Sequence, residues 1–284
     1  MKIGYPLERD KERVKFLWKY CFGDSDSFIN YFFDKYFKKE NTLAVFEGDK
    51  IVADLMFFPY NIVKNGKEMK AAYVCGVCSD PMHRGGGNIT ALFEFLEEKL
   101  KSEGYEAFFL IPFKFSFYRK YGLECASYLH EFSGEIATLP KFDVSFKEGG
   151  ETDGIYKNFC KDKPLYLVRD KKCEDEFLSD TLQEGGHRFL VEDAQMYYFI
   201  QNDTFFAQEL IFSDTEGAKK AINFIKSHSA QVKNFVIRSD FSLSNLLCEK
   251  NIDIKIKPHV MVKYLNGEKV NGDTNAYFNM IGWV

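Results

Sequence analysis

The chain alternates between short apolar runs and amphipathic stretches, separated by turn residues, along its whole length. Apolar runs rich in β-branched and aromatic residues predict strands, and apolar residues spaced three and four apart predict helices. In the first half the pattern predicts, in chain order, helices over 9–22 and 25–37, strands over 42–47 and 51–58 joined by a turn at 48–50, a strand over 73–78, a helix over 90–100 and a strand over 105–112. This alternation predicts an α/β (α+β) fold, with mixed central sheets flanked by helices.

The second half repeats the alternation after its least structured stretch, residues 139–154. The pattern predicts a strand over 128–136 as the last element of the first half. In the second half it predicts helices over 154–160, 175–182 and 216–227, and strands over 187–191, 196–201, 204–211, 234–238, 259–265 and 277–283. With 284 residues and 45% hydrophobic side chains, the chain is large enough for two cores. We therefore expect two domains, residues 1–137 and 138–284.

The join between the predicted strand at 73–78 and the predicted helix at 90–100 is the most informative segment. It reads Arg84-Gly85-Gly86-Gly87. Without Cβ atoms in the way, successive backbone N–H groups can converge on an anion at the positive end of a helix, and the arginine adds a guanidinium. Neither the Walker pattern nor the dinucleotide fingerprint is present. The segment predicts a pyrophosphate site.

This loop resembles the acyl-CoA loop of the GNAT N-acetyltransferases. The family motif is Arg/Gln-x-x-Gly-x-Gly/Ala, and Arg84, Gly87 and Ile89 occupy its three marked positions. Ile89 departs from the pattern, because a large side chain there crowds the usual approach of the ligand. The Eis-like branch accepts a large aliphatic residue in a Pro-x-His-Arg-x-x-Gly context, which Pro81, His83, Arg84 and Gly87 match. The chain therefore resembles the Eis-like acetyltransferases in particular.

The resemblance implies acetyl-CoA as cosubstrate, with the backbone of residues 77–79 pairing with its pantetheine arm and residues 84–88 holding its pyrophosphate. Loop geometry adds Gly86 and Thr90 to the positions carried over from the family. The expected binding residues are Val77, Cys78, Ser79, Arg84, Gly85, Gly86, Gly87, Asn88 and Thr90.

A second family signature, Phe-Tyr-x-x-x-Gly-Phe, is matched from Phe117 to Leu123, with Leu123 in place of the last Phe. The match implies that Tyr118 protonates the departing CoA thiolate, which a phenol within hydrogen-bond reach can do as a general acid. With 30 Phe and 16 Tyr in the chain, a core aromatic is the alternative. The general base stays open between Asp80, Asp54, Glu124 and an ordered water chain.

The second half looks like a degenerate second GNAT fold, because it holds no equivalent of the Arg-x-x-Gly loop. We therefore expect two tandem GNAT-like folds. Larger Eis-like enzymes carry a further sterol-carrier-like domain whose terminal carboxylate reaches the catalytic centre. We expect this chain to lack that domain, so the carboxylate's role is not carried over to Val284.

Charge and cysteine usage exclude several function classes. A net charge of −4 and a pI near 5.8 disfavour nucleic-acid binding. Cys75 and Cys78 form a C-x-x-C inside an apolar strand without a second ligand pair, which disfavours a metal or dithiol centre. Seven unpatterned cysteines suit a reducing cytoplasm. The amino terminus lacks an apolar signal region, and no apolar run approaches the ~18 residues of a membrane span.

Together these features predict an N-acetyltransferase that moves the acetyl group of acetyl-CoA directly to an amine, on a small molecule or a protein. The alternative is a non-catalytic acyl-CoA-binding or regulatory module. Neither the acceptor nor the oligomeric state follows from the sequence.

Overall fold

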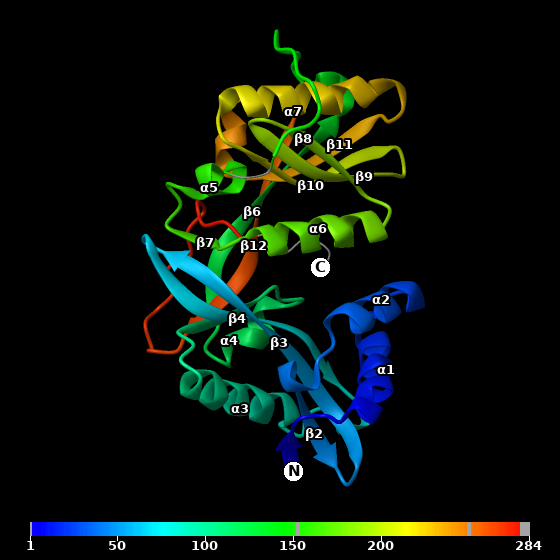
Figure 1. The fold of residues 1–284 in the computed structure, drawn as a ribbon, viewed down its shortest axis with the longest axis vertical. Helices are drawn as coiled ribbons and strands as arrows, with labels where there is room; N and C mark the ends of the chain where they lie inside the picture. Colours follow the sequence, from blue (N-terminus) through cyan, green and yellow to red (C-terminus); the bar gives the residue numbers. More distant parts are fainter. Residues whose placement is uncertain (1, 152–153, 249–250, 279–284) are drawn as a thin grey trace. The chain divides into compact units, whose positions relative to one another are not determined.

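The computed structural model describes residues 2–151, 154–248 and 251–278, and it divides into two compact units (Figure 1). Unit 1 comprises Met1–Ile62, Glu68–Cys125 and Val260–Asn271, and unit 2 comprises Val63–Lys67, Ala126–His259 and Gly272–Val284. In each unit, helices lie on both faces of the strands. The predicted α/β fold, with mixed sheets flanked by helices, is confirmed.

The sheet of unit 1 has the order β1-β2-β3-β4-β5-β12. Its elements are β1 (Lys2–Gly4), α1 (Lys11–Phe22), α2 (Asp26–Tyr36), β2 (Thr42–Glu47), β3 (Lys50–Lys64), β4 (Lys67–Ser79), α3 (Asn88–Ser102), β5 (Ala107–Leu110), α4 (Phe115–Arg119) and the last part of β12 (Asp253–Tyr264). Strand β5 runs parallel to β4 and antiparallel to β12. Figure 1 shows α3 on one face of this sheet and α1 and α2 on the other.

Apolar side chains cover both faces of the unit 1 sheet, and different helices supply them. The α3 face is lined by one stripe of that helix, Leu92, Phe93, Leu96 and Leu100, which packs on strand residues such as Leu55. The opposite face is covered by the aromatic side chains of α1 and α2. Trp18 of α1 stacks 4.6 Å from Phe32 of α2, measured between ring centroids. Sequence periodicity predicted these three helices.

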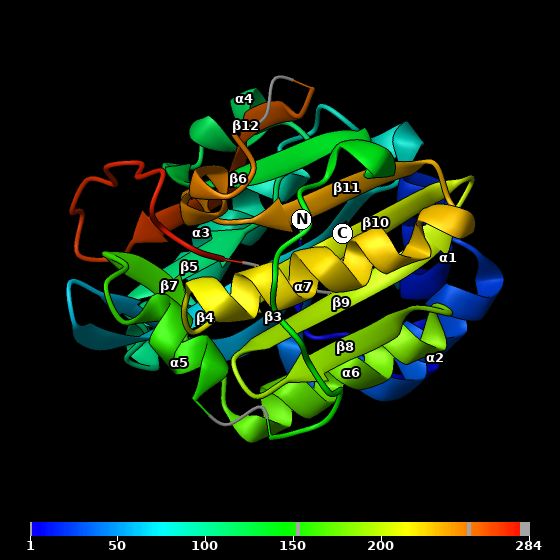
Figure 2. The ribbon, with the colours of Figure 1, turned by 90° about the horizontal axis from the view of Figure 1, so that it is seen from above.

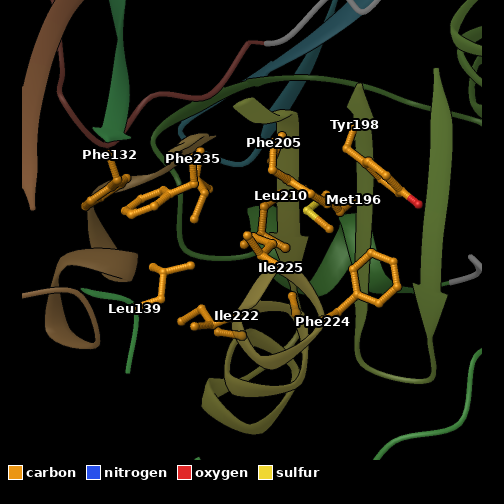
Figure 3. Close-up of a cluster of buried hydrophobic side chains, with 14 of the residues drawn as sticks. Phe132, Leu139, Met196, Tyr198, Phe205, Leu210, Ile222, Phe224, Ile225 and Phe235 are labelled. Carbon is orange, nitrogen blue, oxygen red and sulfur yellow. The ribbon is translucent and has the colours of Figure 1, made fainter. Parts of the chain in front are cut away.

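Unit 2 is built around β12-β6-β11-β10-β9-β8. Its elements are β6 (Glu124–Glu135), α5 (Ile155–Cys160), β7 (Leu165–Leu167), α6 (Lys171–Gln183), β8 (His187–Val191), β9 (Ala194–Gln201), β10 (Thr204–Phe212), α7 (Thr215–Ser227) and β11 (Asn234–Ser239). Helix α7 covers one face, while α5 and α6 lie on the other (Figures 1 and 2). Figure 3 shows Ile222, Phe224 and Ile225 of α7 directed at the strands, where they meet Phe205 and Leu210.

The two units share one order of elements. In unit 1, β2, β3 and β4 follow one another in the sheet, and α3 leads to β5, parallel to β4; in unit 2, β8, β9 and β10 do the same, and α7 leads to β11, parallel to β10. An antiparallel strand then follows in each sheet, β12 beside β5 and β6 beside β11. Strand β12, which lies beside β5, comes from the second half of the sequence, and β6, which lies beside β11, comes from the first half.

Most predicted elements are present, with shifted ends. The strands at 42–47 and 187–191 have the predicted bounds, whereas β12 begins at Asp253, six residues before the predicted start, in an exposed run that alternates Ile with Lys. The hairpin between β3 and β4 was not predicted; its turn at Asn65 and Gly66 has positive φ at both residues. The strand expected at 277–283 lies largely outside the described residues.

Candidate active site

The predicted phosphate loop joins β4 to α3. Strand β4 ends at Ser79, and the Asp80 carboxylate accepts a hydrogen bond from the Met82 amide at 3.1 Å, which starts a short 3₁₀ turn. Gly87 then has φ of +79°, a conformation that side chains with a Cβ rarely adopt, and it is the N-cap of α3. No side chain caps the first amides of this helix. They are therefore available to an anion.

The pairing of β4 with β5 ends before β4 reaches this loop. Strands β4 and β5 pair in register only from Ala71 to Tyr73, opposite Ala107 to Phe109. Three residues further on, Gly76 has φ of +60°, and a Cβ there would lie 2.8 Å from both Met56 Cε and a Trp18 ring carbon. Only glycine fits, so the strand turns at this position. The backbone after Gly76 leads to the glycine loop.

A cavity of about 640 Å³ lies over the loop and the end of β4. Its lining includes these residues expected to bind acetyl-CoA: Val77, Ser79, Arg84, Gly85, Gly87, Asn88 and Thr90. Two others, Cys78 and Gly86, are not in the lining, and the Cys78 side chain is fully buried. Ile89, the departure from the family motif, lines the cavity as well. Geometry thus brings most of the predicted residues to one place, while their binding role stays a prediction.

The cavity also has walls that the sequence did not indicate: Cys21, Phe22, His83, Phe113, Phe117, Lys120 and Tyr121. The first two end α1, which is far from the loop in sequence, so no local motif could include them. Lys120 and Tyr121 occupy variable positions within the Phe117–Leu123 signature and could have been considered with it. The Lys120 ammonium lies 4.8 Å from the centre of the Tyr121 ring, which places a cation at the cavity wall.

Tyr118 lies deeper than expected for a residue that meets the substrate. Only 4% of it is exposed, and it does not line the cavity; its neighbours Phe117 and Tyr121 do. Its ring is in edge contact with Phe117 at 5.0 Å and Phe93 at 6.1 Å, measured between ring centroids. Burial raises the pKa of the Tyr118 phenol, with the nearby Cys78 thiol adding to the effect, so the hydroxyl stays protonated at neutral pH.

None of the three carboxylates considered as general base lines the cavity. Arg13 lies 2.5 Å from the Asp80 carboxylate, and this hydrogen bond is the main reason that the pKa of Asp80 falls well below its usual range. A carboxylate of such low basicity is a weak proton acceptor. Glu124 accepts a hydrogen bond from the Val270 amide at 3.2 Å. Asp54 is completely buried in β3, and neither of its oxygens has a hydrogen-bond partner among the described residues.

Asp54 should make stability depend on pH. Burial raises its pKa well above the usual value, so from about pH 4 upward the unfolded chain ionises this group while the folded protein keeps it protonated. Stability is therefore lost as pH rises, by about 1.4 kcal/mol per unit until the folded pKa is reached. We expect Asp54→Asn to raise the free energy of unfolding by about 1–3 kcal/mol at neutral pH.

Urea unfolding of both proteins at several values between about pH 5 and pH 8 measures this effect. The difference between Asp54→Asn and the unchanged protein should grow with pH. A difference that stays constant over this range would show that Asp54 is ionised in the folded protein, contrary to our expectation.

No helix among residues 2–151, 154–248 and 251–278 is both long and apolar enough to cross a membrane. In the same part of the chain, no three His, Cys, Asp or Glu side chains are grouped so that they could hold a metal ion.

Comparison with known proteins identifies the amino-terminal part of the chain. Residues 5–126 match the sequence model of a family described as "Acetyltransferase (GNAT) domain". This range contains the glycine loop and all the residues that line the cavity. No curated protein matches the sequence.

Several solved structures share the fold over 93% of this chain. One is a conserved protein of unknown function from Enterococcus faecalis V583, described as a probable N-acyltransferase (TM-score 0.79, 19% identity, 72% of that chain covered). Another is a GCN5-related N-acetyltransferase from Kribbella flavida (0.77, 19%, 70%). A third is Eis1 from Mycobacterium abscessus (0.70, 13%, 73%). At these identities the similarity shows the fold. Residues 5–126 therefore match a GNAT acetyltransferase domain, as the glycine loop predicted.

Proposed function

We propose that the protein is an acetyl-CoA-dependent N-acetyltransferase of the Eis-like branch, which transfers the acetyl group directly to an amine. One observation carries the proposal. The cavity of unit 1 combines the uncapped N-terminus of α3, the Arg84 guanidinium and the backbone of β4 that follows Gly76. The helix end suits a pyrophosphate, and the strand edge suits the amide groups of a pantetheine arm.

In the proposed reaction the amine nitrogen attacks the thioester carbonyl carbon, the C–S bond breaks, and the thiolate leaves. Tyr118 supplies a proton to that sulfur as general acid, and a proton from the attacking amine passes to a base. The raised pKa of Tyr118 keeps the proton on the phenol until the thiolate forms. The acceptor is an amine on a small molecule or a protein.

Seven cysteines without a recognisable spacing pattern suit a reducing compartment, which supports a cytoplasmic location.

We further propose that residues 138–284 form a degenerate second GNAT domain. The shared order of elements supports this proposal. At the N-terminus of α7, which corresponds in order to α3, the Asp214 carboxylate accepts a hydrogen bond from the Gly217 amide at 3.0 Å. A carboxylate of the protein thus occupies the helix end where α3 leaves its amides uncapped. The second domain would have lost its CoA site in this way.

A non-catalytic acyl-CoA-binding module is a second candidate, favoured by the position of Tyr118 beneath the cavity wall. Consumption of acetyl-CoA in the presence of a mixture of amines separates the two. A transferase releases CoA in proportion to the acetylated amine, whereas a binding module releases none.

Thermal unfolding with acetyl-CoA, CoA and ATP tests the binding site. Ligand at ~100 times its Kd stabilises the folded state by about 2.7 kcal/mol. We expect both CoA compounds to raise the Tm, and the double variant Arg84→Glu, Gly87→Glu to lose this response, because it places two negative charges at the proposed pyrophosphate site.

Two further variants complete this experiment. Arg84→Gln leaves the backbone of the loop intact, and we expect it to weaken the response without abolishing it. Lys172→Glu reverses a charge on a side chain that is 82% exposed in unit 2, and it should respond like the unchanged protein. No response of the unchanged protein to either CoA compound would refute the acetyl-CoA assignment.

A further inference from the structure

We propose that Cys21 and Cys78 are a reactive thiol pair in the cavity wall, which organic or inorganic hydroperoxides oxidise to an intramolecular disulfide. The two residues come from different elements. Cys21 lies in the last turn of α1, and Cys78 is one residue before the end of β4.

The Cys21 side chain contacts β4 at Ser79, the residue directly after Cys78, and only one of the two thiols is accessible. Cys21 is partly exposed and lines the cavity, whereas Cys78 is fully buried behind it. The Cys21 sulfur also lies 3.7 Å from the Ser79 carbonyl oxygen and 3.9 Å from an Arg84 guanidinium nitrogen. A hydroperoxide entering the cavity would therefore meet the Cys21 sulfur first, with Cys78 directly beneath it.

The surroundings give the two sulfurs different protonation states. The hydrogen bond from Cys78, with further contributions from the Ser79 backbone and Arg84, lowers the pKa of Cys21 to about 6, although burial opposes the shift. Burial raises the pKa of Cys78 well above its usual value. At neutral pH the pair therefore consists of a thiolate facing the cavity and a thiol behind it, which suits a nucleophile and a resolving partner.

The oxidation takes place in two steps. The Cys21 thiolate attacks the hydroperoxide, an S–O bond forms while the O–O bond breaks, and the alkoxide leaves as an alcohol after taking a proton. The Cys78 sulfur, having given up its proton, then attacks the Cys21 sulfenic acid; an S–S bond forms, the S–O bond breaks, and water leaves. In sum, two thiols and one organic hydroperoxide give one disulfide, one alcohol and one water; with hydrogen peroxide a second water takes the place of the alcohol.

Mass spectrometry of the intact protein tests this pairing without any use of acyl-CoA. After treatment with tert-butyl hydroperoxide, we expect the unchanged protein to lose the mass of two hydrogen atoms. A non-reducing peptide map should show the peptides of Cys21 and Cys78 linked, and dithiothreitol should reverse the change. Cys248→Ser, which removes an exposed thiol outside the cavity, should behave identically.

Cys78→Ser removes the resolving thiol, so we expect oxidation to stop at a sulfenic acid on Cys21 that dimedone can trap. If this variant does not fold, the peptide map of the unchanged protein still tests the pairing. Recovery of Cys21 and Cys78 in unlinked peptides, under conditions that fully oxidise Cys248, would overturn the proposal.

A second experiment, protection of the thiols by acetyl-CoA, rests on the proposed function. It can fail even when the disulfide itself forms. Acetyl-CoA bound in the cavity would cover Cys21, so saturating acetyl-CoA should slow formation of the disulfide. If the disulfide forms at the same rate with and without acetyl-CoA, the thiol pair stands and the position assigned to acetyl-CoA is wrong.

Discussion

Tyr118→Phe is expected to lower turnover by about 10- to 100-fold while acetyl-CoA binding changes little. The substitution removes one hydroxyl and keeps the ring that packs against Phe93 and Phe117. If Tyr118 donates the proton to the leaving thiolate, the loss appears only in the transition state. The turnover number and kcat/KM should then fall together, and the thermal shift with acetyl-CoA should remain.

The neighbouring tyrosine provides a matched control. Tyr121 lines the cavity itself, and its ring lies 4.6 Å from that of Phe93, measured between centroids. Tyr121→Phe also removes one hydroxyl from a largely buried ring, so it matches the change in size and packing. We expect turnover of this variant to stay within about threefold of the unchanged protein.

The comparison of the two variants decides which phenol acts. Full turnover of Tyr118→Phe together with a large loss in Tyr121→Phe would move the general acid to Tyr121, the residue that the cavity exposes. Equal and small effects in both would remove tyrosine from the mechanism. A fall in the Tm of Tyr118→Phe, with turnover restored at lower temperature, would indicate a packing role.

The parts of the fold that the sequence predicted are those encoded by local pattern. The glycine loop, the strand before it and the helix after it are adjacent in sequence, so residues such as Arg84 and Asn88 could be assigned to one cavity in advance. The apolar stripe of α3 and the aromatic residues of α2 likewise follow from helical spacing.

What the sequence did not predict depends on contacts between distant segments. Cys21 reaches the cavity because the end of α1 packs against β4, and the depth of Tyr118 results from three-dimensional packing of aromatic rings around it. The Asn65-Gly66 turn, by contrast, is a local hairpin signal that could have been recognised. The capping of α7 by Asp214 was equally local, since an Asp followed by a helical stretch indicates an N-cap.

Glu209→Gln is expected to destabilise the protein by about 3–5 kcal/mol, because it leaves a buried guanidinium without its main counter-charge. Both oxygens of Glu209 accept hydrogen bonds from Arg169 at 2.7 Å, and the two side chains are 1% and 0% exposed. The Tyr277 hydroxyl donates to the same carboxylate at 2.8 Å. The amide can keep one of these contacts but carries no charge, so the carboxylate of Glu174, 3.5 Å from Arg169, is left to offset the desolvation of the guanidinium.

Urea unfolding of four variants separates this cause from a loss of packing: the double variant Arg169→Met, Glu209→Gln, its two single variants, and a surface control. The double variant Arg169→Met, Glu209→Gln removes both charges, so it should be destabilised by less than the sum of its two single variants. Glu176→Gln, which breaks a 3.8 Å ion pair with the exposed Lys172, serves as the surface control and should cost no more than about 0.5 kcal/mol. Strict additivity in the double variant would mean that the charges of Arg169 and Glu209 contribute independently. In that case, the cost of burying an unpaired charge could not be the reason that Glu209 is needed.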